Sequence, residues 1–85
     1  MRMQTMEVTL DRKSTNYNEL MEIIDAVGGY PVVAKDFDGT KLAISCKENG
    51  SDEWCMVFEP GVGEEKTRIT NYHKDGRVEI THGDF

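Results

Sequence analysis

Two aspartates separated by one residue, Asp36 and Asp38, are the pair in this chain best spaced for chemistry. They follow an apolar run at residues 32–34 and precede Gly39-Thr40. A carboxylate at the end of a strand can act as a nucleophile, and a second carboxylate nearby can transfer a proton or help to hold Mg²⁺. The pair is therefore the first candidate for a catalytic site.

The segment from Val32 to Thr40 resembles the first motif of haloacid-dehalogenase-type phosphatases, an apolar strand followed by Asp-x-Asp-Gly-Thr. The resemblance implies Asp36 as the nucleophile, Asp38 as the general acid and a phosphate held by Mg²⁺. That chemistry also needs a Lys or Arg and more carboxylates from other strands, in a parallel sheet of a chain more than twice this length. Here a turn and an antiparallel strand follow the motif, so we expect a hairpin and not a phosphatase.

A glycine-containing loop and four residues of metal-binding type are the other candidates for chemistry. Residues 61–67 carry Glu65 where a phosphate-binding loop needs glycine before its lysine. Eight residues separate the members of each like pair of potential zinc ligands, unlike the close spacing of zinc motifs: Cys46 and Cys55, His73 and His82. The sequence therefore predicts no enzyme, no metal site and no cofactor.

Length and composition limit the remaining classes of protein. The chain has 85 residues, with 16 acidic and 10 basic side chains and a formal net charge of −6, enough for one small domain. This acidity disfavours direct binding of nucleic acid, and no apolar run or leader-like segment indicates a membrane span or secretion. We expect a reduced cytoplasmic protein, in the host cytoplasm if a phage encodes it. Residues 1–5 should be flexible and residues 6–85 should form one domain.

One amphipathic helix and six short strands are predicted. Residues 17–27 place apolar side chains on one stripe, with Asn16 as the N-cap and Gly28-Gly29 at the end. Asp-Gly and Asn-Gly pairs mark hairpin turns after the helix. Strands are expected at residues 6–10, 30–37, 41–47, 53–59, 66–73 and 77–82. The predicted fold class is α+β, a single domain of order β-α-β-β-β-β-β: an antiparallel meander sheet of five to six strands with one helix packed on one face.

The register of the central hairpin can also be predicted. We favour the pairing of Lys47 with Glu53, which aligns two sets of side chains on one face: Leu42, Ile44 and Cys46 with Phe58, Met56 and Trp54. A slip by one residue would place the two cysteines opposite each other. The element order resembles the cystatin-type arrangement, in which a sheet curls around one helix. Residues 31–35 do not match the Gln-x-Val-x-Gly motif of that family, so protease inhibition is not carried over.

Negative charge is concentrated in the middle of the chain. Residues 14–65 carry a net charge of −8, and both ends are mildly basic. The predicted helix, the central hairpin and the long loop after it carry most of these acids, and one tryptophan lies among them. Such a surface aids solubility, and it is also complementary to a basic partner. The candidate partner-binding residues are Glu19, Glu22, Asp25, Glu48, Asp52, Glu53, Trp54, Glu64 and Glu65.

We therefore expect a small acidic, non-enzymatic interaction protein with a basic protein partner. Its most specific form is a phage or mobile-element inhibitor of the anti-CRISPR or anti-defence type, which binds the basic nucleic-acid-binding surface of another protein. One alternative is an oligomeric protein that sequesters a small molecule or nucleotide in a pocket lined by Tyr30, Trp54 or Tyr72. A further alternative is a small structural or regulatory subunit, dimeric through an edge strand.

Overall fold

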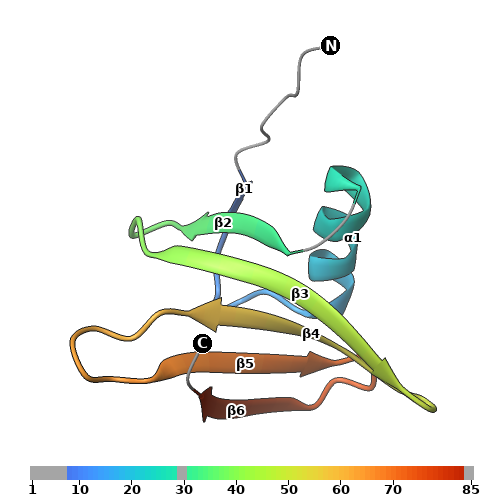
Figure 1. The fold of residues 1–85 in the computed structure, drawn as a ribbon. Helices are drawn as coiled ribbons and strands as arrows, with labels where there is room; N and C mark the ends of the chain where they lie inside the picture. The colour runs from blue at the N-terminus through green and yellow to red at the C-terminus, as the bar shows by residue number, and fades with distance from the viewer. Residues whose placement is uncertain (1–7, 29–30, 84–85) are drawn as a thin grey trace.

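A computed structural model describes residues 8–28 and 31–83 of the chain. Figure 1 shows one helix packed on one sheet, which confirms the predicted α+β class. The elements are β1 (Val8–Leu10), α1 (Tyr17–Val27), β2 (Val32–Asp36), β3 (Lys41–Asn49), β4 (Asp52–Glu59), β5 (Thr67–His73) and β6 (Val78–Gly83). The flexible segment expected at residues 1–5 lies outside the described residues, as does Tyr30.

Helix α1 begins and ends at the residues that the sequence predicts. The side chain of Asn16 accepts a hydrogen bond of 3.0 Å from the backbone N–H of Glu19, which caps the first turn. Gly28 has φ of 88° and donates its N–H to the carbonyl of Ile24, so the helix ends in a left-handed residue. With 11 residues, the helix of the described chain is neither long nor apolar enough to cross a membrane.

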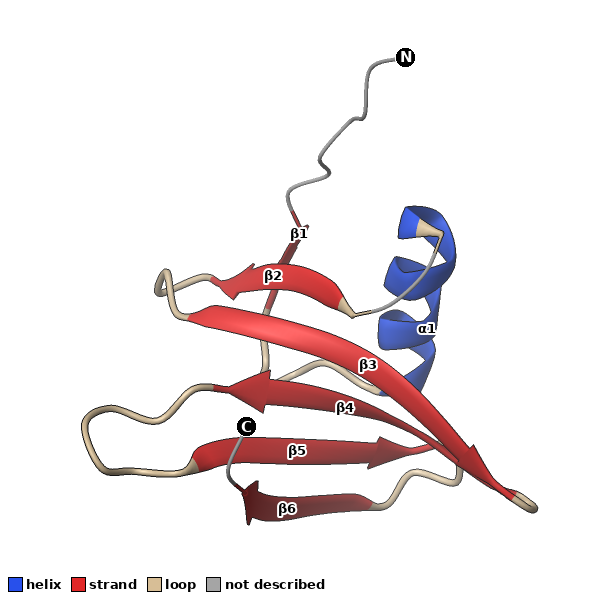
Figure 2. Cartoon of the chain, viewed as in Figure 1, coloured by secondary structure: helices blue, strands red, loops and turns tan. Residues whose placement is uncertain are grey.

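The six strands lie side by side in chain order, from β1 at one edge to β6 at the other. Strands β2 to β6 form the predicted antiparallel meander. Strand β1 differs, because it pairs with β2 in parallel and the chain returns between them through α1 (Figure 2). A parallel pair needs a crossover of this kind, since a short turn joins only antiparallel neighbours.

The register of the β3–β4 hairpin differs by one residue from the predicted one. Lys47 pairs with Trp54 and Cys46 pairs with Cys55, so the prediction that Lys47 pairs with Glu53 is wrong. The cause lies in the turn, because only Gly50 and Ser51 separate the paired ends of the strands. Gly50 has φ of 65°, as the first central residue of a tight type II′ turn requires. This two-residue turn sets the register.

The two faces of the sheet have different environments because of this register. The face against α1, called the helix face below, carries the core together with the buried side of the helix: Leu10, Leu20, Ile24, Val32, Ala34, Leu42, Ile44, Cys55, Val57 and Tyr72. The other face, called the open face, carries Trp54, Met56 and Phe58, each half-buried. Trp54 is therefore outside the core.

Helix α1 packs against β3 and β4 and covers only part of the helix face (Figure 1). Strands β5 and β6 extend beyond it, and Val78 and Ile80 of β6 are 57% and 50% exposed. One edge of the molecule therefore has an uncovered apolar surface.

Candidate functional site

The three predicted acids of α1 are all exposed, but only two of them face the same groove. Glu19 and Glu22 line a groove of about 630 Å³ between α1 and β1, whereas Asp25 does not line it. At 3.6 residues per turn, successive members of this series are rotated about the helix axis, so the third acid turns away. Within residues 8–28 and 31–83, none of the three forms an ion pair.

The groove combines an apolar wall with an acidic rim. Its apolar lining comes from both sides and from the β2–β3 turn: Val8, Leu10, Ile23, Ala26 and Phe37. Phe37 is 75% exposed, so a large aromatic side chain lies at the surface beside the groove. Strand β1 is an edge strand, and edge strands expose backbone groups that can pair with another chain.

The acids of the central hairpin divide between the two faces of the sheet. Asp52 lies on the open face, where its Oδ1 is 3.3 Å from Nδ1 of His73 and 3.4 Å from Nη2 of Arg77. The buried ring of His73 also has Oε1 of Glu79 at 3.0 Å from its Nε2. Trp54 packs on this ring with a centroid distance of 5.5 Å. Asp52 and Trp54 are thus part of a charge-compensated cluster of β4, β5 and β6.

Glu53 is also neutralised by the β5–β6 turn. Its Oε2 accepts a hydrogen bond of 3.0 Å from Nζ of Lys74, and this contact raises the pKa of the lysine. Glu48 is the direct cross-strand partner of Glu53 and lies with it beside Tyr17 at the start of α1. The acidic tip expected from the sequence is therefore partly paired with bases from the following hairpin.

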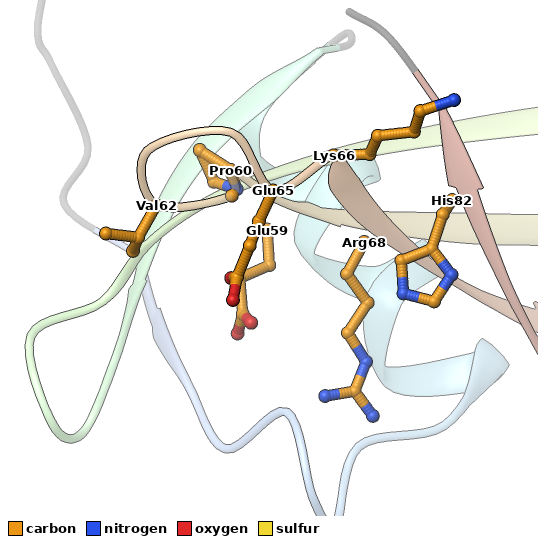
Figure 3. A pocket seen from close by; sticks show the side chains of 8 residues that line it. Glu59, Pro60, Val62, Glu65, Lys66, Arg68 and His82 are labelled. Carbon is orange, nitrogen blue, oxygen red and sulfur yellow. The ribbon is translucent and has the colours of Figure 1, made fainter.

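The loop acids lie at the opposite end of β4 from the hairpin. Glu64 and Glu65 are exposed, and Glu65 lines a cleft of about 540 Å³ together with Glu59, Arg68 and His82. Figure 3 shows the Arg68 side chain beside the ring of His82, on a wall of this cleft. The nine candidate residues thus form separate groups on different parts of the molecule. Of these groups, Glu19 and Glu22 are the pair without a compensating base at a groove.

Sequence reasoning missed Arg12, which forms the centre of a four-residue ion-pair cluster. Its guanidinium lies 3.1 Å from Asp36, 3.4 Å from Asp38 and 2.5 Å from Glu59. The parallel pairing places Leu10 opposite Asp36, so residue 12 follows at the carboxyl end of β2. A parallel register, had it been assumed, would have revealed this contact.

This cluster also determines the setting of the predicted phosphatase-like pair. Asp36 is 8% exposed and accepts a hydrogen bond from the N–H of Phe37. Asp38 accepts a hydrogen bond from the backbone N–H of Thr40, and hydrogen bonds from Thr40 lower its pKa. Both carboxylates therefore have partners in the fold, as expected for a hairpin.

The four potential zinc ligands do not gather at one place. Cys46 and Cys55 are free thiols that face each other on the helix face, and burial raises the pKa of both. His73 lies on the open face, and His82 lies on β6 at the cleft of Figure 3.

In comparisons with known proteins, no family model, no curated protein and no solved structure matches this chain.

Proposed function

We propose that the protein is a non-enzymatic binding protein whose groove between β1 and α1 takes up a basic, extended segment of a partner protein. The observation that carries this proposal is the pair Glu19 and Glu22, two carboxylates without an ion pair among the described residues, on the rim of an apolar groove. Unpaired charge beside apolar surface is the combination that a cationic, amphipathic segment complements.

The open edge of β1 supports an extended conformation for the bound segment. A peptide can add a strand to an exposed sheet edge, with main-chain hydrogen bonds that supply affinity and side chains that supply specificity. In this arrangement apolar side chains of the segment contact Ile23 and Phe37, and its Lys or Arg side chains reach Glu19 and Glu22. Alternation of apolar and basic residues is the pattern that suits such a strand.

The proposed mode of action is stoichiometric inhibition. Many basic surfaces bind nucleic acid through Lys and Arg side chains that neutralise phosphates. Carboxylates held on a folded scaffold can occupy those side chains instead. The small size and the charge of −6 are consistent with an inhibitor of the anti-defence type encoded by a phage or mobile element.

A labelled peptide of alternating arginine and valine tests the groove. We expect its binding, followed by fluorescence anisotropy, to weaken about tenfold in the double variant Glu19→Gln/Glu22→Gln, which corresponds to ~1.4 kcal/mol. Phe37→Ser should weaken binding without a change in charge. The double variant Glu64→Gln/Glu65→Gln removes the same charge from the β4–β5 loop and should bind like the original protein.

Three outcomes would contradict the proposal. If the groove and loop variants weakened binding of the arginine–valine peptide equally, the binding would be general charge attraction. The same conclusion would follow if a lysine-only peptide bound as tightly as the arginine–valine peptide. Absence of binding by the arginine–valine peptide would remove the groove as a site for basic segments. The inhibitory mode is tested separately, because the protein should release a short fluorescent DNA duplex from the same peptide, and the groove variant should not.

A further inference from the structure

A second cleft lies on the part of the helix face that α1 does not cover. It has a volume of about 410 Å³, and β5 and β6 form its floor with Thr70, Tyr72, Val78 and Ile80. The turn that joins β1 to α1 closes the other side through Arg12, Lys13 and Thr15. Pockets that bind small molecules have volumes of roughly 300 to 1,000 Å³ and mostly apolar walls with a few polar groups.

The lining of this cleft is basic although the chain is acidic. It holds three cations and a single carboxylate, Glu59, in a protein with a net charge of −6. Glu59 is engaged by Arg12, with Oε1 and Nη1 2.5 Å apart. Lys13 and Arg68 remain, and neither forms an ion pair in the described part of the chain. The uncompensated charge at the cleft is therefore positive.

Thr15 supplies a polar group without a partner at the same place. The residue is only 9% exposed, and its Oγ1 has no hydrogen-bond partner among the described residues. The hydroxyl of Tyr72, by contrast, donates to the carbonyl of Arg12 at 2.7 Å. An unpartnered buried hydroxyl costs free energy, and a hydrogen bond from it to a ligand oxygen in the cleft would remove that cost.

Hydrogen bonds to Asp11 order the turn between β1 and α1. Asp11 accepts hydrogen bonds from the backbone N–H of Lys13 and from the hydroxyl of Ser14, each 2.9 Å long. The carbonyl of Asp11 accepts the N–H of Thr15 at 2.9 Å. The backbone that carries Thr15 is therefore ordered before a ligand binds, which lowers the conformational entropy lost on binding.

We propose that this cleft binds a small organic anion, a phosphate monoester or a carboxylate attached to an apolar ring. The anionic group pairs with Arg68 and Lys13 and accepts the hydroxyl of Thr15, while the ring covers Val78 and Ile80. The site is distinct from the β1–α1 groove and does not depend on the function proposed for it. The sequence predicted, as an alternative, a ligand pocket lined by Tyr30, Trp54 or Tyr72. Among the described residues of that set, only Tyr72 lines this cleft.

Titration calorimetry of the full chain with four probes tests the ligand class. Phenyl phosphate and benzoate distinguish the two anionic groups, phenol carries the ring without the charge, and inorganic phosphate carries the charge without the ring. We expect phenyl phosphate or benzoate to bind at least about tenfold more tightly than both phenol and inorganic phosphate. Equal affinity for phenol and for the anions would overturn the proposal, and so would absence of binding by both anions.

Three variants assign the binding to the named side chains. Arg68→Gln should weaken the binding of the anion about tenfold or more. Lys41→Gln removes an exposed cation outside the cleft and should leave the affinity unchanged. Ile80→Thr should weaken the binding of phenyl phosphate and leave the affinity for inorganic phosphate unchanged. If Lys41→Gln weakened binding as much as Arg68→Gln, the site would be general positive charge and the proposal would fail.

Thr15→Val separates ligand binding from folding. The change replaces the unpartnered hydroxyl by a methyl group of similar shape, so the melting temperature should stay the same or rise. Affinity for the anion should fall about fivefold, because the hydrogen bond to the ligand is lost. Unchanged affinity together with a raised melting temperature would overturn the proposed contact, because Thr15 would then be only an unsatisfied core hydroxyl.

Discussion

Removal of the Arg12 guanidinium should destabilise the fold more than any other loss of a single surface charge in the described structure. Arg12→Gln leaves Asp36, 8% exposed, and Glu59, 24% exposed, without their counter-charge. Loss of one partner from a buried ion pair costs about 3 to 5 kcal/mol. Because Arg12 itself keeps partial contact with water, we expect the lower end, ~3 kcal/mol. Asp38 is exposed and adds little.

Urea unfolding and thermal melting measure this effect. A domain of 85 residues has a free energy of unfolding of about 4 to 13 kcal/mol, so the variant should remain folded at room temperature. Its melting temperature should fall by roughly 12 to 24 °C. Lys13→Gln is the matched control, since the neighbouring cation has no ion pair in the described residues and should change stability by less than ~0.5 kcal/mol.

A double-mutant cycle tests the physical reason. If the loss comes from the uncompensated carboxylate, Asp36→Asn should cost much less in the Arg12→Gln background than alone, with a coupling free energy above ~1 kcal/mol. Additive effects within ~0.5 kcal/mol would refute the reasoning, because the two side chains would then act independently.

The other predictions concern the helix cap, the thiols and acid stability. Asn16→Ala removes the acceptor for the N–H of Glu19 and should lower the free energy of unfolding by about 1 kcal/mol in urea titrations, whereas no change would contradict the capping role. Diamide, a thiol oxidant, should join Cys46 and Cys55 with the loss of two hydrogen atoms, measured by mass spectrometry of the intact chain. The Cys55→Ser variant should not show that loss, and intermolecular products would argue against the pairing. Stability should also fall on acidification below about pH 4, because the backbone N–H of Lys13 and then the Ser14 hydroxyl lower the pKa of Asp11 from its ordinary value of 3.8. The stabilising contribution of Asp11 is fully present above the pKa that this residue has in the unfolded chain. It is lost as the pH falls through the lower pKa that the residue has in the folded protein. Asp11→Asn should therefore flatten the dependence of the urea midpoint on pH between about 5 and 3.

The helix and the strand order could be predicted because local signals agree with the tertiary structure. Asn16 and Gly28 mark the two ends of α1, and both perform these roles in the structure. Glycines with positive φ lie in three of the predicted turns: Gly39, Gly50 and Gly76. Each signal depends on neighbours in the chain, so no long-range information was needed.

The predicted register was wrong because β4 carries large apolar side chains on both of its faces. The side-chain pattern aligned Trp54 on one face with Ile44 and Cys46, whereas the two-residue turn after Asn49 puts Cys55 on the face that carries them. A period of two cannot distinguish the faces when each of them carries large apolar residues. Turn geometry was the stronger constraint.

The candidate site was predictable only as a list of acids. The sequence located Glu19 and Glu22 on an exposed helix surface, but it did not reveal that β1 lies alongside them. It also could not show that His73, Lys74 and Arg77 neutralise the hairpin acids, because β4–β5 pairing brings distant segments together. Which acids remain available to a partner therefore depends on which of them the fold leaves without an ion pair.

The crossover from β1 through α1 to β2 has a consequence for synthesis of the chain. The ribosome completes α1 at residue 27, yet the helix packs against β3 and β4, and β4 ends at residue 59. At a synthesis rate of about 5 to 20 residues per second, roughly 2 to 6 s pass between completion of α1 and completion of β4. A helix of 11 residues is marginal in water on its own. During synthesis α1 is thus complete before the β3–β4 hairpin, which supplies the surface that it packs against in the fold.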